Sequence, residues 1–133
     1  MVIADGVHVS PTALQLLFRA KGADRVALVT DSVRFQRKTW GLLQRGGAYY
    51  DRHGTLAGST LTMIQAVRNA VKLAEASLID AVRMASEVPA RLLGDRSRGA
   101  LEVGKRADVV AFDRNFRILL TLVDGRIVYD RRG

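Results

Sequence analysis

The stretch MVIADGVHVSPTALQLLFRAKGADRVALVTDS, residues 1–32, places a helical pattern between two short apolar runs. The runs lie within residues 1–4 and 25–30, and each has the length of a buried β-strand. The pattern between them begins after Ser10, a residue type that caps helix N-termini, and ends at Gly22, a common helix stop. A strand, a helix and a second strand in this order predict two parallel strands joined by a right-handed crossover.

The middle of the chain changes from loop-like to helical patterning. Residues 31–59 are rich in glycine, and we expect mostly loop there, with one short helical or strand element. An apolar stripe then predicts a helix over residues 63–74, with Asn69 among the residues that face away from it. A second helix is expected to start near Ser77, and Pro89 is expected to open a third.

The last third of the chain has the pattern of antiparallel β-structure. Residues 107–112 and 118–123 carry apolar runs, and Asp124-Gly125 is a two-residue hairpin signal before an alternating run over residues 126–129. Parallel strands need both faces covered, and an isolated hairpin is only marginally stable. The pattern therefore predicts an α/β chain that is either a piece of a larger protein or a subunit whose sheets are completed by association with another chain.

Composition excludes several classes of protein. The chain has 133 residues, a net charge of +8, no cysteine and 48% apolar residues. The apolar content argues against disorder, and the lack of cysteine excludes a disulfide scaffold and a cysteine-ligated zinc site. Without a long apolar run or a secretory signal, we expect a cytoplasmic protein with no membrane partner. Scattered arginines and few aromatic residues (6%) argue against nucleic acid as a partner.

Several motifs, taken in order, resemble one family. They are IADGVHV, LVTDS, GTLAGSTLTM and RMASEVPARLLG, followed by GALEVGKRADVVAFD and TLVDGRIVYD. This order resembles the C-terminal third of N-acetylglucosamine-6-phosphate deacetylase, in the amidohydrolase superfamily. The ending is shared by many amidohydrolases, whereas GTLAGSTLTM ahead of the MASEVPAR helix is much more specific.

The resemblance implies a fold and a division into domains. The family is a metal-dependent (β/α)₈ barrel with a small added β-sandwich. The expected fold class is therefore α/β, with the last strands and helices of a partial (β/α)₈ barrel followed by strands of the sandwich. Residues 1–95 would be the C-terminal portion of the barrel, and residues 96–133 would be strands of the small β-sandwich. A whole barrel takes about 250 residues, so this chain cannot close one.

Asp31 is the candidate catalytic residue. It follows an apolar strand, at the C-terminal end where barrel enzymes place their catalytic groups. The resemblance makes it the carboxylate that takes a proton from the attacking water and hands it to the departing amine. The alternative is a structural aspartate that caps the following turn through its own side chain.

The resemblance also implies contacts with a substrate, an amino-sugar phosphate. His8, at a strand end, would contact the sugar, and the alternative is a packed or surface histidine with no special role. Leu56, Ala57, Gly58 and Ser59 would form a substrate-contacting loop, in which glycine lets backbone N–H groups approach a ligand. The alternative for this loop is a tight turn with a helix N-cap.

Metal ligands are the part of the family pattern that has no match in this sequence. The parent enzymes use a divalent metal, zinc or iron, held by a glutamate and histidines from earlier barrel strands. The histidines here are His8 and His53, and His53 is expected in a loop. Because a catalytic zinc site takes three protein ligands, we assign no residue to a metal and expect none to bind this chain alone.

Two hypotheses of function follow. The first is a truncated member of the deacetylase family, whose parent reaction hydrolyses an acetamide to glucosamine 6-phosphate and acetate. Such a chain would be inactive alone and would need a missing N-terminal half. The second is a non-enzymatic module that keeps part of the amidohydrolase fold and forms a homo-oligomer through unpaired strand edges.

Overall fold

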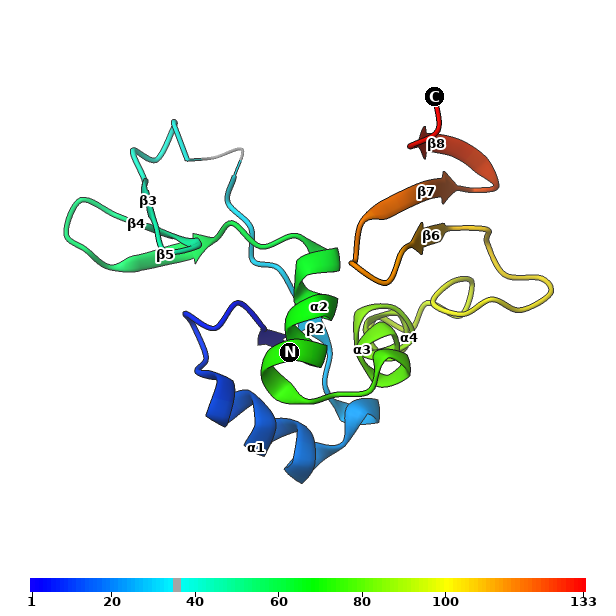
Figure 1. Ribbon diagram of the computed structural model, residues 1–133, viewed down its shortest axis with the longest axis horizontal. Helices are drawn as coiled ribbons and strands as arrows, with labels where there is room; N and C mark the ends of the chain where they lie inside the picture. Colours follow the sequence, from blue (N-terminus) through cyan, green and yellow to red (C-terminus); the bar gives the residue numbers. More distant parts are fainter. Residues whose placement is uncertain (35–36) are drawn as a thin grey trace.

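The computed structural model describes residues 1–34 and 37–133. β1 (Val2–Ile3) and β2 (Leu28–Val29) pair in parallel, and α1 (Pro11–Lys21) lies between them in the chain (Figure 1). The predicted strand, helix and strand are therefore confirmed, together with their parallel pairing.

Local hydrogen bonds set the two ends of α1. The hydroxyl of Ser10 accepts a hydrogen bond from the amide of Ala13 over 3.3 Å, as an N-cap does. Gly22 ends the helix with a φ of 73°, and its amide donates to the carbonyl oxygen of Phe18. A 3-10 turn over Ala23–Arg25 follows, so β2 is shorter than the apolar run that predicts it.

Three helices follow in the second half of the chain. They are α2 (Met63–Ala74), α3 (Leu78–Ala85) and α4 (Glu87–Leu92). α3 begins directly after Ser77, whose hydroxyl caps it as predicted. The expectation that Pro89 opens the last helix is wrong, because α4 begins two residues earlier. Proline fits the first turn because its missing N–H group would have no partner within the helix there.

The hydrophobic core lies where the strand pair meets the helices. Leu14 of α1, Leu28 of β2 and Met84 of α3 are each at most 1% exposed and belong to one buried cluster. Ala66 and Ala70 on the buried face of α2 are fully buried, so the stripe predicted for this helix is confirmed. Burying a side chain of leucine or methionine size stabilises the fold by about 1.5–3 kcal/mol.

The glycine-rich middle of the chain contains a three-stranded antiparallel sheet, where the sequence predicts mostly loop and only one short element. β3 (Leu43–Arg45), β4 (Ala48–Tyr50) and β5 (Leu56–Ser59) pair in that order. Gly46 and Gly47 turn the chain between β3 and β4 with φ values of 58° and 87°. These glycines supply the left-handed backbone that a tight hairpin requires, and they do not mark an irregular loop.

The last third forms a second three-stranded antiparallel sheet, as predicted. β6 (Val109–Phe112), β7 (Ile118–Val123) and β8 (Arg126–Asp130) pair in chain order. Asp124 and Gly125 both have positive φ, as the hairpin signal predicts. The expected alternation of buried and exposed side chains along the last strand is not observed, because the apolar side chains of β8 are 46–61% exposed.

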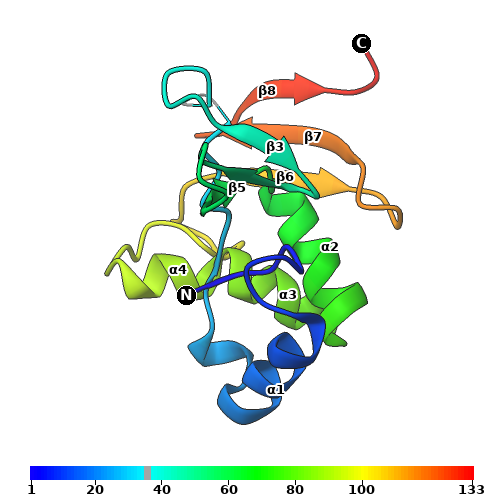
Figure 2. The same cartoon turned by 90° about the vertical axis from the view of Figure 1, so that its left-hand side faces the viewer.

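The two three-stranded sheets lie on opposite sides of the N-terminal end of α2, with the β1–β2 pair and α1 below them (Figure 1). The view turned by 90° again shows both sheets toward one end of the molecule and α1 at the other (Figure 2). Within residues 1–34 and 37–133, no helix has the length and apolar content needed to cross a membrane.

Candidate active site

Asp31 lies just beyond the C-terminal end of β2, the position expected from the sequence. The parallel register places Ile3 opposite Val29, so Asp5 and Asp31 each stand two residues beyond this pair. Because parallel strands run in the same direction, the segments that carry these two aspartates both follow the C-terminal ends of the strands, on the same side of the sheet. The strand-end position of Asp31 is confirmed, and its catalytic role stays a prediction.

The carboxylate of Asp31 is exposed to solvent at the end of β2. The residue has a φ of 49°, a left-handed conformation that aspartate tolerates better than most residues. Within residues 1–34 and 37–133, its side chain accepts no hydrogen bond from a backbone amide. The turn that follows includes residues outside this range, so the turn-capping alternative stays open beside the catalytic one.

Strand β5 fixes the backbone at Asp31. The amide of Ser59 donates to the carbonyl oxygen of Asp31 over 2.9 Å, and Ser32 and Ser59 form a parallel bridge. Gly58 makes this approach possible, because a Cβ atom there would lie 2.7 Å from the side chain of Val33. That separation is shorter than real Cβ contacts allow, so the site requires glycine.

Ser59 is fully buried, and its hydroxyl is used inside the chain. The hydroxyl donates to the carbonyl oxygen of Thr30 and accepts from the amide of Leu61 over 3.0 Å. The helix N-cap is Thr62, three residues later, so the alternative role of Ser59 as the cap is wrong. Through these hydrogen bonds, Ser59 joins β5 to the end of β2.

The predicted substrate loop is a strand. Leu56, Ala57, Gly58 and Ser59 make up β5, which pairs with β4, and Leu56 and Ala57 are half-buried. The sequence reading missed this strand because glycine and alanine are weak strand formers. The predicted contact of these residues with a substrate stays a prediction.

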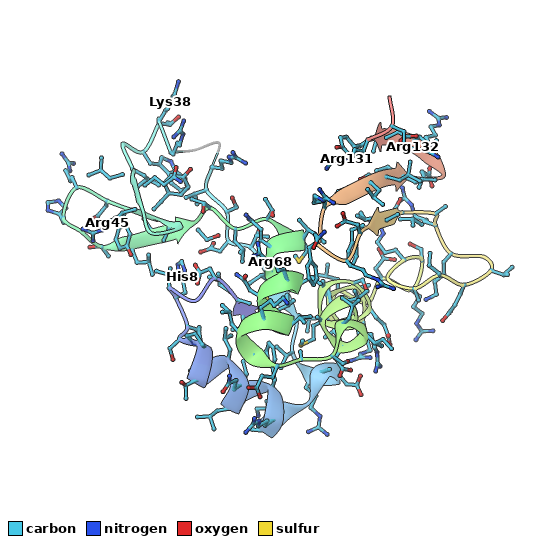
Figure 3. The ribbon with its side chains drawn as sticks, in the orientation of Figure 1. His8, Lys38, Arg45, Arg68, Arg131 and Arg132 are labelled. Carbon is cyan, nitrogen blue, oxygen red and sulfur yellow. The ribbon has the colours of Figure 1, made fainter. Side chains whose placement is uncertain are left out.

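His8 lies in the loop after β1 (Figure 3). There its ring pairs with the carboxylate of Asp5. Its Nδ1 atom is 2.6 Å from Oδ2 of Asp5, and the two side chains are 16% and 4% exposed. Burial tends to raise the pKa of Asp5, but hydrogen bonds from His8 and from the amides of Val7 and His8 outweigh it and hold that pKa below its usual value. Asp5 is therefore ionised at neutral pH.

Two residues make contacts at the end of β1 that the sequence does not predict. No role is assigned to Asp5 from the sequence, although an aspartate with a histidine three residues later is the signal that could have shown the pair. Asn69 of α2 was expected to face away, but its Nδ2 group donates to the carbonyl oxygen of Ala4 over 2.8 Å. This bond ties α2 to the segment just before Asp5.

His53 lies in the loop between β4 and β5, as expected. In the part of the chain that the structure describes, no three histidine, aspartate or glutamate side chains come together as a metal-binding group. Three ligands are the usual requirement of a catalytic zinc site. These residues therefore do not fit a metal centre, and no chemical step is assigned to a metal.

Comparison with known proteins agrees with the motifs. The sequence profile of the Amidohydrolase family matches residues 1–128. N-acetylglucosamine-6-phosphate deacetylase of Haemophilus influenzae is 33% identical, and the match covers 94% of this chain and 35% of that protein. An Escherichia coli K12 protein named as a candidate N-acetylgalactosamine-6-phosphate deacetylase is 37% identical, over 95% of this chain and 80% of that protein.

A solved structure shows the same likeness in three dimensions. The crystal structure of N-acetylglucosamine-6-phosphate deacetylase from Pasteurella multocida superposes with a TM-score of 0.86 at 34% identity. The superposition covers 95% of this chain and 35% of that one, so the chain spans about a third of the length of these full-length relatives. On the profile match, the relatives and the superposition together, the chain belongs to the amidohydrolase family, within its group of N-acetylglucosamine-6-phosphate deacetylases.

Proposed function

We propose that this chain is the C-terminal part of a carbohydrate deacetylase and supplies its acid/base carboxylate, Asp31. The observation that carries the proposal is an exposed carboxylate at the C-terminal end of a parallel strand, one that accepts no hydrogen bond from an amide within residues 1–34 and 37–133. Barrel enzymes place their catalytic groups at such ends. The substrate class is an amino-sugar phosphate, as the names of the relatives indicate for those proteins.

The proposed division of the chain follows the barrel and the sandwich. Residues 1–95 would form the last part of a (β/α)₈ barrel, which the parallel β1–α1–β2 unit supports. Residues 96–133 would belong to a small β-sandwich, which the antiparallel β6–β7–β8 sheet supports. The exposed apolar side chains of β8 fit this division, because a second sheet of a sandwich would cover one of its faces.

In the proposed reaction, water adds to the carbonyl carbon of the acetamide, and the bond between that carbon and the sugar nitrogen breaks. Asp31 accepts a proton from the attacking water and then donates it to the departing amine. The products are acetate and the amino-sugar phosphate, and Asp31 ends in its starting state. Proton transfer by one positioned side chain contributes about 10²–10⁴-fold to a rate.

His8 and the residues of β5 are the proposed substrate contacts. His8 follows β1, whose end lies at the same sheet edge as that of β2. The end of β5 meets the backbone at Asp31, so Gly58 lies next to the proposed catalytic residue, and Leu56 and Ala57 precede it on the same strand. Ser59 contributes indirectly: it donates hydrogen bonds to the carbonyl oxygens of Thr30 and Asp31, and these bonds hold the backbone of Asp31 in place.

We further propose that the chain is inactive alone and acts in the cytoplasm with a polypeptide that carries the metal ligands. The test is the metal content and acetate release of the purified chain on N-acetylglucosamine 6-phosphate with added Zn²⁺ or Fe²⁺. The assay is repeated after adding the preceding two thirds of the Haemophilus influenzae enzyme as a separate polypeptide. Turnover only in the mixture supports the proposal, and turnover by the chain alone contradicts it.

The second candidate function is a non-enzymatic module that associates with itself. The exposed side chains of Ile127, Val128 and Tyr129 on β8 favour it, because a sheet with apolar residues open on both faces is a site of association. This candidate predicts a stable oligomer by light scattering and no acetate release in any mixture. A monomer that gains activity in the mixture would rule it out.

A further inference from the structure

A pocket lies at the end of the β3–β4–β5 sheet that faces away from Asp31. The register pairs Leu43 with Tyr50 and Tyr50 with Leu56, so the segments before β3 and β5 and the segment after β4 meet at this end. Asp31 lies at the opposite end of β5, where the amide of Ser59 donates to its carbonyl oxygen. The pocket and the candidate catalytic residue are therefore separated by the length of the strand.

The pocket has the size of a small-molecule site and is framed by two turns. Its volume is about 640 Å³, and its walls come from residues 38–41 and 51–53. Ligand pockets in proteins usually measure about 300–1,000 Å³. The amide of Leu42 donates to the carbonyl oxygen of Arg37 over 2.9 Å in the first turn. In the second turn, Oδ1 of Asp51 accepts from two amides, each over 2.8 Å.

Two cations in the pocket wall have no acidic partner. Lys38 and Arg52 are exposed, and within residues 1–34 and 37–133 neither takes part in an ion pair. A guanidinium group matches two phosphate oxygens at once, and an ammonium group binds phosphate as a point charge. The acidic residue in the wall is Asp51, whose Oδ1 is already used by its own turn. Lys38 and Arg52 therefore attract an anionic group to their side of the pocket.

An exposed indole ring completes the pocket. Trp40 lines it and is 57% exposed, although tryptophan is on average a well-buried residue. The flat face of an indole stacks on the ring of a ligand, and aromatic side chains beside cations hold the rings and phosphates of nucleotides in this way. The pairing of Trp40 with Lys38 and Arg52 therefore fits a ligand that carries both a ring and a phosphate.

We propose that this pocket binds a phosphomonoester whose phosphate contacts Lys38 and Arg52 and whose ring stacks on Trp40. Two kinds of compound share this chemistry. A nucleoside monophosphate offers a planar base to the indole, and a sugar phosphate offers the C–H face of its ring. The carboxylate of Asp51 accepts a hydrogen bond from a hydroxyl or amino group of either compound. The site uses no residue of the candidate active site, and it does not rest on the proposed function.

The fluorescence of the whole chain tests this site directly, because Trp40 is the only tryptophan of the sequence. The probes are adenosine monophosphate, glucosamine 6-phosphate and, by competition, inorganic phosphate. We expect at least one of the two ring compounds to change the fluorescence with a Kd below about 1 mM, at least about tenfold tighter than inorganic phosphate. A tighter nucleotide identifies the base as the stacking ring, and a tighter sugar phosphate identifies the sugar. Either result supports the site.

Two results of this titration would overturn the proposal. One is unchanged fluorescence with both ring compounds up to about 10 mM. The other is inorganic phosphate that competes as tightly as the better ring compound, which would show that Trp40 adds nothing. Trp40→Ala, followed by calorimetry, should lower the affinity for the ring compound to that of inorganic phosphate. An unchanged affinity in this variant also overturns the proposal.

The role of the cations is tested with Arg52→Gln, which should raise Kd by at least about tenfold. Arg131→Gln is the matched control and should change Kd by less than about twofold. Arg131 is also exposed and lies outside the ion pairs formed within residues 1–34 and 37–133, and Figure 3 shows it well apart from Lys38. Equal losses in the two variants would mean that the ligand responds to net charge alone, and the pocket would not be its site.

Discussion

The backbone amide of Ser59 donates a hydrogen bond to the carbonyl oxygen of Asp31 over 2.9 Å. Ser59 ends a strand of an antiparallel sheet, whereas Asp31 follows a strand of the parallel pair. This bond, with the parallel bridge between Ser32 and Ser59, therefore joins the two sheets at the candidate catalytic residue. It explains how an exposed aspartate with a left-handed backbone keeps a defined position.

Replacing Ser59 by alanine should lower the free energy of unfolding by about 1–3 kcal/mol. The change leaves the amide of Leu61 without its acceptor and the carbonyl oxygen of Thr30 without its donor, in a fully buried position. Urea unfolding measures the difference. Ser32→Ala is the control, because Ser32 is exposed, and its effect should stay within about 0.5 kcal/mol. Equal losses in the two variants would contradict the role given to Ser59.

Gly58→Ala should destabilise the chain more than Gly54→Ala does. Both glycines have positive φ, 138° and 83°, so alanine is strained at each, at a cost of about 1–2 kcal/mol. Only Gly58 also faces a steric clash, with the side chain of Val33, whereas Gly54 has open space around it. We expect an additional loss of about 1–3 kcal/mol for Gly58→Ala in thermal or urea unfolding. Similar losses would mean that β5 does not approach Val33 closely.

The stability of the chain should depend on the ionisation of Asp5 in acid. The pKa of Asp5 is lower in the folded chain than the unfolded value of about 3.9, so its contribution is complete above that value and is lost as the pH falls through the folded pKa. Asp5→Asn removes this contribution at every pH. The variant should be less stable than the natural chain at pH 7, and their unfolding free energies should converge in acid. A constant difference from pH 7 down into acid would contradict this assignment.

The sequence predicted the elements whose signals are local. Ser10, Gly22 and Ser77 mark helix ends by their own chemistry, and Asp124-Gly125 marks a hairpin, so these features are confirmed. The stripe of α2 is confirmed for the same reason, since its period is visible along the chain.

The features that the sequence reading missed depend on contacts between distant residues. Strand β5 contains Gly58, a poor strand former, and exists because it pairs with β4 and meets the backbone at Asp31. Asn69 belongs by period to the outer face of α2, but it meets a carbonyl group 65 residues earlier. For the site, the position of Asp31 was predictable from strand order, whereas the i, i+3 spacing of Asp5 and His8 only hints at their pairing, which depends on how the loop after β1 folds.

The most direct measurement is the rate of acetate release by a chimera. In it, this chain replaces the matching third of the Haemophilus influenzae N-acetylglucosamine-6-phosphate deacetylase, with Asp31 either kept or changed to asparagine. Asparagine also tolerates the left-handed backbone at this position, so the variant should fold. Asp124→Asn, at an exposed turn with positive φ, is the matched control.

If Asp31 is the acid/base group, Asp31→Asn should lower kcat/KM by about 10²–10⁴-fold, while Asp124→Asn leaves it unchanged. An active chimera that keeps its full rate with Asp31→Asn would contradict the central claim that this chain supplies the catalytic carboxylate.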